Sequence, residues 1–256
     1  MGRARRPNKS YPPEKKSTYR RKQEQREREA IEEVGGVVVP IRKNLFKPKT
    51  DNQRRLISSI KSNACTFAMG PAGTGKSYVA LSVACDMLVN GLIDKIICLK
   101  PNTEIDSELG VLPGNKDEKL AVLYNPMKQI FNKILGISHF ENLIRNGKII
   151  LEPLGSILGM TYDRAIMVVD EAQYTTPGQM KVILTRLGED TKIVICGDYK
   201  EQRFESGMSG LEDSYRRLRY KDSVGSIEFE LSDIVRSPFT KQVIESYREK
   251  YDLAAE

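Results

Sequence analysis

Apolar residues along the chain fall into short continuous runs, which are separated by longer stretches with helical periodicity. The runs are rich in Ile and Val, which is typical of strands buried on both faces of a parallel sheet. Alternation of such strands with helices predicts an α/β fold, in which a doubly wound, mostly parallel sheet carries helices on both faces. The expected strands are Cys65–Met69, Ile96–Leu99, Ile149–Leu151, Ile166–Val169 and Ile193–Cys196.

The stretches between the runs predict the helices and one further strand. Pro126 should kink or divide one of the helices, and Gly188 suits the end of another. The segment SIEFEL alternates apolar and polar residues, which predicts an edge strand. The expected helices are Asp51–Lys61, a helix with Val79 to Leu88 on its apolar face, Lys119–Leu135, Pro177–Leu187, and a last helix after Pro238 that carries Val243, Ile244, Tyr247 and Tyr251.

A glycine-rich loop follows the first expected strand and fits the pattern G-x-x-x-x-G-K-[ST]. Its backbone N–H groups would form a concave cradle for phosphate, and the helix after it adds the positive end of its dipole. The pattern predicts a nucleoside triphosphate site in which Lys76 reaches the β- and γ-phosphates and Ser77 ligates Mg²⁺. The loop consists of Gly70, Pro71, Ala72, Gly73, Thr74, Gly75, Lys76 and Ser77.

Acidic residues follow one of the later strands. In AIMVVDEAQ, an apolar run leads to Asp170 and Glu171 at the carboxyl end of a buried strand. Ligands bind at that end of an open parallel sheet. We expect Asp170 to hold the metal and its water, and Glu171 to polarise the attacking water. The next strand ends in GDYKEQ, which places further polar groups where they can sense the γ-phosphate.

A cationic side chain is also expected, because charge develops on the outer phosphate oxygens in the transition state. Arg236 in SDIVRSP and Arg186 in LTRLG are the candidates. We favour Arg236, which lies late in the chain just before a helix that begins with proline. An exposed arginine without a catalytic role is the alternative for both.

The charge of the chain is unevenly distributed. The 256 residues carry a formal net charge of +7, and much of the positive charge lies near the amino terminus. Residues 1–34 are poor in aliphatic side chains, so we expect a disordered basic tail, followed by a single domain at 35–256. The tail is either a solubilising tether or an arm that contacts nucleic-acid phosphates.

Two features bear on location. No apolar stretch approaches the roughly 18 residues needed to cross a bilayer, and the basic amino terminus lacks the apolar segment of a secretory signal. The four cysteines stand singly inside apolar patterns without a C-x-x-C pair, so we expect buried thiols in a reducing compartment. We therefore expect a cytoplasmic protein with no membrane partner.

Five segments together resemble the PhoH-like family of P-loop ATPases, of the phage-type stand-alone kind, over about Asn44 to Tyr247. The resemblance implies a RecA-like core related to superfamily-one helicases, hydrolysis of ATP with Mg²⁺, a link to RNA metabolism, and assembly into a ring. It further implies that Gln53 recognises the adenine edge, and that the γ-phosphate sensor is Gln202 or Glu201. The segments are GPAGTGKSYVA, ELGVLPGNKDEK, VVDEAQYTTPGQMKVILTRLGEDTKIVICGD, SGLED and SDIVRSPF.

The chain has material for one such core, which would leave a bound nucleotide open on one side. We therefore expect a homo-oligomer, with a hexameric ring favoured and Arg236 acting across the interface. Three functions are weighed. One is an ATPase or translocase on single-stranded RNA or DNA, with Lys100 and Asn102 lining the strand-binding surface. The others are an ATP-dependent switch or assembly scaffold and a phosphotransferase without motor activity.

Overall fold

The chain folds around a parallel sheet, which a computed structural model describes over residues 46–101, 123–157, 159–200 and 207–252. The strand order is β3-β2-β4-β5-β1-β6, and every neighbouring pair is parallel. The predicted α/β fold is thereby confirmed, and strands form at all six predicted places. Strand β3 was predicted to be buried but lies at an edge and is only partly buried, and the predicted edge strand ends at Glu228, before Phe229 and Leu231. The strands are β1 (Cys65–Met69), β2 (Lys95–Lys100), β3 (Ile149–Pro153), β4 (Ala165–Val169), β5 (Lys192–Gly197) and β6 (Val224–Glu228).

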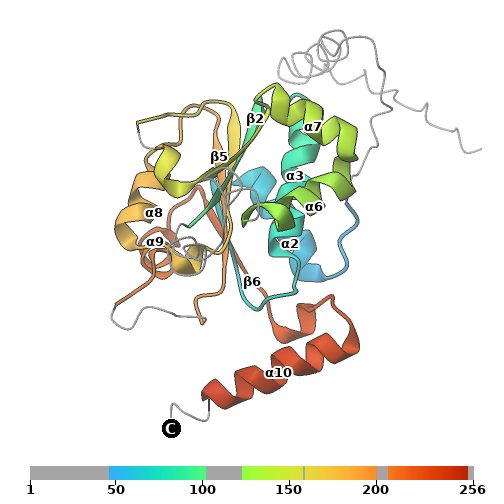
Figure 1. The fold of residues 1–256 in the computed structure, drawn as a ribbon. Coiled ribbons are helices and arrows are strands. Elements are labelled where there is room, and N and C mark those ends of the chain that lie inside the picture. Colours follow the sequence, from blue (N-terminus) through green and yellow to red (C-terminus); the bar gives the residue numbers. More distant parts are fainter. Residues whose placement is uncertain (1–45, 102–122, 158, 201–206, 253–256) are drawn as a thin grey trace, which may run out of the picture. The chain divides into compact units, whose positions relative to one another are not determined.

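Helices cover both faces of the sheet, because successive strand side chains point to opposite sides. Ala68 and Val168 face one core, whereas Phe67 and Met167 face the other. One side carries α8 (Pro177–Leu184) and α9 (Gly210–Leu218), and the other side carries α2 (Asp51–Ser62), α3 (Lys76–Val89), α6 (Asn125–Leu135) and α7 (Ile137–Arg145). Figure 1 shows α8 and α9 on one side of the sheet and the remaining labelled helices of the core on the other.

Helix α8 ends earlier than the sequence pattern predicts. It stops at Leu184 rather than Leu187, and Gly188 does not end it. The chain turns because the amide of Thr185 donates to the carbonyl of Val182 at 3.2 Å, as in a 3₁₀ turn. Leu187 then forms a parallel bridge with Tyr162, so the prediction of a longer helix was wrong. The apolar spacing continued past the helix because Leu187 still packs on the same core.

Helix α6 also differs from its prediction. It begins at Asn125 and carries Pro126 in its first turn, where the missing N–H group costs nothing, so Pro126 neither kinks nor divides it. The part of the predicted helix before Leu123 lies outside the described residues. Helix α7 follows directly after Gly136 and was not predicted.

The last helix, α10 (Pro238–Asp252), lies where the sequence predicts it and has an exposed face. Phe239 is 74% exposed and Tyr247 is 69% exposed, and Val243 between them is also exposed. These three residues are spaced by four and share one helix face. The face is apolar and lacks a covering element within the described residues.

The remaining predictions about the chain have mixed outcomes. All four cysteines are buried, as predicted. Among the described residues, no helix combines the length and the apolar character needed to cross a bilayer. The predicted basic tail at 1–34 lies outside the described residues.

Candidate functional site

Strand β1 carries the glycine-rich loop to the carboxyl edge of the sheet. Gly70 follows the strand at a φ of 130°, and a Cβ there would stand 2.3 Å from the carbonyl oxygen of Phe229. Only glycine fits both conditions. Gly75 precedes helix α3 in the left-handed conformation and has no side chain that could cap the first N–H groups of the helix. Uncapped N–H groups at a helix start attract anions, which fits the predicted phosphate cradle.

Side chains of the loop donate hydrogen bonds to backbone carbonyls of the same loop. The ammonium of Lys76 donates to the carbonyl oxygens of Gly70 and Pro71 at 2.7 and 2.8 Å, and the hydroxyl of Thr74 donates to Pro71 at 2.9 Å. Burial lowers the pKa of Lys76, and the negative charges around it oppose this only in part. A bound phosphate would compete with the carbonyls of Gly70 and Pro71 for the ammonium of Lys76.

The loop and the acidic pair meet at one point. The hydroxyl of Ser77 donates to the Oδ1 atom of Asp170 at 2.5 Å, although the two residues are 93 positions apart in the sequence. Two oxygen ligands of this kind suit Mg²⁺, which usually takes one or two protein ligands and completes its shell with water and phosphate oxygens. The residues present thus fit the magnesium ion that the sequence predicts. The two motifs therefore meet at one edge of the sheet, while their binding of magnesium and a triphosphate stays a prediction.

Glu171 lies next to this pair in an unusual backbone conformation. Its φ and ψ are 56° and 40°, in the left-handed region that residues other than glycine seldom adopt. Burial raises the pKa of Glu171, and the charge of Asp170 raises it further, whereas a hydrogen bond from Gln173 and the charges of Lys100 and Lys76 lower it. The net effect is a raised pKa, which brings the carboxylate closer to the range useful for a general base.

Gln173 is a site residue for which the sequence predicted no role. Its side chain is buried, its Nε2 donates to Oε2 of Glu171 at 2.7 Å, and its Oε1 accepts from the backbone amide of Asp198 at 3.1 Å. A Cβ at Gly197 would stand 2.6 Å from the same Oε1 atom. Gln173 therefore joins the ends of β4 and β5 and fixes the direction of the Glu171 carboxylate.

Gln53 lies beneath the loop. It is 2% exposed, its Nε2 donates to the carbonyl of Thr74 at 2.9 Å, and its Oε1 accepts from the amide of Lys49 at 2.8 Å. A Cβ at Gly75 would stand 2.9 Å from that Nε2 atom. These contacts support the loop from within the chain. The recognition of adenine by Gln53 stays a prediction.

Arg236 lies against the loop of its own chain. A Cβ at Gly73 would stand 2.9 Å from Cγ of Arg236, and the amide of Val235 donates to the carbonyl of Gly73 at 3.1 Å. The segment that carries Arg236 is held to α2, because Asn52 donates to Asp233 at 2.7 Å. The sequence did not reveal this attachment, since its two halves are far apart along the chain.

Arg186, the other candidate for the cationic role, is remote from the loop. Its carbonyl accepts from the amide of Tyr162, which precedes the start of β4, whereas the loop lies at the carboxyl ends of the strands. Gln202, Glu201 and Asn102 lie outside the described residues. Lys100 is buried at the end of β2.

Proteins that join a glycine-rich phosphate loop to a strand-end acid across one parallel sheet are P-loop NTPases, and this chain is one of them. The family model described as PhoH-like protein matches residues 45–248. The chain belongs to the PhoH-like family, as the sequence resemblance indicated.

Relatives agree with this assignment. The chain is 40% identical to the PhoH-like protein of Bacillus subtilis (strain 168) over 203 residues, which cover 79% of this chain and 64% of the relative. It is 33% identical to Protein PhoH of Escherichia coli (strain K12) over 202 residues, which cover 78% of this chain and 57% of the relative. The matched part of the chain thus spans less than two thirds of either relative.

Solved structures resemble the chain only distantly. The UvsW helicase from bacteriophage T4 matches with a TM-score of 0.47 and 12% identity, covering 72% of this chain and 61% of that one. The Pif1 helicase from Candida albicans matches with a TM-score of 0.36 and 12% identity, covering 72% and 39%. Similarity at this level supports no inference about function.

Proposed function

We propose that the chain binds ATP with Mg²⁺ at the loop and hydrolyses it. The observation that carries the proposal is the hydrogen bond between Ser77 and Asp170, with Glu171 beside it. In this role the loop N–H groups and Lys76 hold the phosphates, Ser77 and Asp170 hold the metal, and Glu171 orients the attacking water. Mg²⁺ neutralises charge on the phosphate oxygens. Water is favoured as the acceptor because Glu171 is a fixed carboxylate next to the metal ligand.

We further propose that hydrolysis depends on a single-stranded nucleic acid, RNA or DNA. The net charge of +7 supports a polyanionic partner, and basic side chains gather at the end of α9. The test is ATP turnover with and without single-stranded RNA and DNA homopolymers. Stimulation of several fold supports the proposal. Turnover that is indifferent to every polymer contradicts it and favours the switch or scaffold, while phosphate transfer to a metabolite favours the phosphotransferase.

Replacing Gln173 with alanine should shift the acid limb of the pH–kcat profile to higher pH. The hydrogen bond from Gln173 favours the ionised form of Glu171, so its loss raises the pKa of Glu171 and removes activity on the acid side. The expected shift is about one pH unit, because a hydrogen bond to a charged group is worth about 1.5 kcal/mol or more.

The control for this change is Gln179→Ala, which removes an amide that caps α8 and does not contact Glu171. Steady-state turnover between pH 5 and pH 9 measures both variants. A profile for Gln173→Ala that keeps the wild-type limb, at a lower overall rate, would mean that Gln173 has only a structural role.

The apolar face of α10 supports assembly of several copies of the chain, for which a hexameric ring is proposed. Replacing both Phe239 and Tyr247 with aspartate should leave the protein monomeric. The two new carboxylates would be buried without partners against the apolar face of a neighbouring copy. Light scattering measures the mass. The control, Gln242→Asp, adds one charge to an exposed position on the same helix and should leave the mass unchanged. A double variant with the wild-type mass would exclude this face from the interface.

A further inference from the structure

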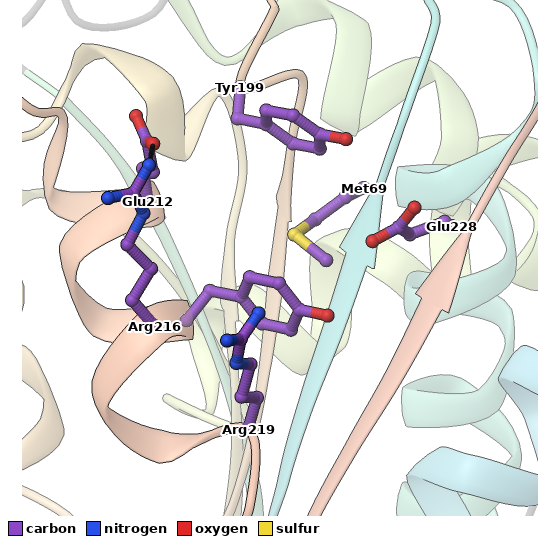
Figure 2. A pocket seen from close by; sticks show the side chains of 7 residues that line it. Met69, Tyr199, Glu212, Arg216, Arg219 and Glu228 are labelled. Atoms are coloured by element: carbon purple, nitrogen blue, oxygen red, sulfur yellow. Dashed lines mark hydrogen bonds and ion pairs between the residues drawn. The ribbon is translucent and has the colours of Figure 1, made fainter.

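A small pocket lies on the α9 side of the sheet, apart from the glycine-rich loop. It has a volume of about 220 Å³ and is lined by Met69, Tyr199, Glu212, Tyr215, Arg216, Arg219 and Glu228. Figure 2 shows Tyr199 and Arg219 on opposite sides of it, with Met69 and Glu228 on the strand side and Glu212 and Arg216 on the helix side. The pocket therefore combines aromatic, cationic and acceptor groups with the side chain of Met69.

Planar groups are stacked at the edge of this pocket. The guanidinium of Arg219 lies 4.7 Å from the ring centroid of Tyr220 and 6.0 Å from that of Tyr215. Tyr220 is 82% exposed, so nothing within the described residues covers the outer face of this stack. Exposed aromatic and guanidinium planes are the surfaces on which unpaired bases stack.

The charged groups around the pocket leave one guanidinium available for a phosphate and one carboxylate available for a base. Arg216 forms an ion pair with Glu212 at 2.5 Å, which neutralises that carboxylate, and Arg217 pairs with Asp213 at 2.9 Å. Within the described part of the chain, Arg219 forms no ion pair. Glu228 remains on the strand side, where its oxygens are acceptors for the amino or imino N–H groups of a base.

The pocket is connected to the proposed catalytic site by three residues. Met69, Tyr199 and Glu228 also line a larger cavity of about 460 Å³, which includes Gly70 and Pro71 of the glycine-rich loop. Tyr199 directly follows Asp198, whose backbone amide donates a hydrogen bond to Gln173. The side chain of Gln173 in turn donates to the carboxylate of Glu171. A ligand that moves Tyr199 can therefore change the position of the carboxylate that orients water.

We propose that this pocket receives one unpaired base of a single-stranded nucleic acid, with Arg219 and Tyr220 holding the adjacent nucleotide by stacking and phosphate contact. The proposal rests on the proposed function, since it names where the polymer binds. It adds that binding occurs on the α9 face and that Tyr199 transmits it to Glu171.

The test is fluorescence anisotropy of labelled 12-nucleotide single strands, one RNA and one DNA arm, with the full chain and a non-hydrolysable ATP analogue. Tyr220→Ala should weaken binding about tenfold, because a base stacked on an aromatic ring contributes that much or more. Arg219→Ala should weaken binding and reduce the slope of log K against log salt by about 0.7. Both side chains are exposed, so neither change should lower the thermal unfolding midpoint.

Arg217→Ala is the control, because it removes the same charge two residues before Arg219, in the last turn of α9, but does not line the pocket. If the wild-type chain binds and Arg219→Ala and Arg217→Ala weaken that binding equally, the proposed pocket is wrong. Unchanged binding by Tyr220→Ala would also overturn it. In both cases the nucleic-acid dependence would stand. A wild-type chain that binds neither strand would instead overturn the nucleic-acid function together with the pocket. Tighter binding of one arm identifies the polymer.

Discussion

Replacing Glu171 with glutamine should lower the kcat of ATP turnover by about 10²–10⁴-fold while ATP binding is preserved. The carboxylate is half-buried beside Asp170, its pKa is raised, and Gln173 fixes its direction. Glutamine has nearly the same shape but cannot accept a proton from water. Because neither the loop nor the metal ligands change, the dissociation constant of the ATP analogue should stay within a few fold of the wild-type value.

Turnover of radiolabelled ATP and calorimetric binding of the analogue measure the two halves of this prediction. Glu189→Gln removes a carboxylate from an exposed turn and is the control. Residual turnover within tenfold of the wild-type rate would show that another group orients the water. Loss of binding together with turnover would instead give Glu171 a role in holding the nucleotide.

Replacing Arg236 with alanine should reduce kcat roughly 10³-fold, the effect typical of an arginine that stabilises the transition state. The side chain lies against Gly73 of its own loop, which supports action within one chain, whereas the sequence led us to expect action across an interface. The guanidinium also lies near the loop, because its Nε atom would stand 3.7 Å from a Cβ at Gly73. Arg186→Ala, remote from the loop, should leave kcat unchanged.

Mixing two inactive variants separates action within a chain from action across an interface. Lys76→Ala lacks the phosphate-binding lysine and Arg236→Ala lacks the arginine. If Arg236 serves its own loop, a mixture of the two should remain inactive after subunit exchange. Recovery of turnover toward a quarter of the wild-type rate, the limit for random exchange of equal amounts, would mean that the arginine enters the neighbour's site, as the sequence led us to expect.

The sequence predicted the sheet, the glycine-rich loop and the acidic pair, because each depends on a pattern of residues that are close together along the chain. Continuous apolar runs mark strands buried on two faces, and the glycine spacing marks the loop. The placement of Asp170 at the end of its strand then followed from the rule that ligands meet the carboxyl ends of parallel strands. The bond between Ser77 and Asp170 agrees with this reasoning.

The sequence could not reveal features that depend on contacts between distant segments. Gln173 looks like any polar residue after a strand, and its role is visible only when Asp198 and Glu171 lie on either side of it. The contacts of Gln53 and Arg236 with the loop likewise join segments separated by more than 20 residues. The early end of α8 was hidden because Leu187 preserves the apolar spacing after the helix has stopped.

A crystal structure of the chain with Mg²⁺ and a non-hydrolysable ATP analogue tests the proposed site most directly. We expect the β- and γ-phosphates to lie on the backbone of residues 73–77, Lys76 to have left the carbonyls of Gly70 and Pro71, and one Mg²⁺ to lie between Ser77 and Asp170. A triphosphate bound elsewhere, or a metal held without either of these two residues, would contradict the proposed site.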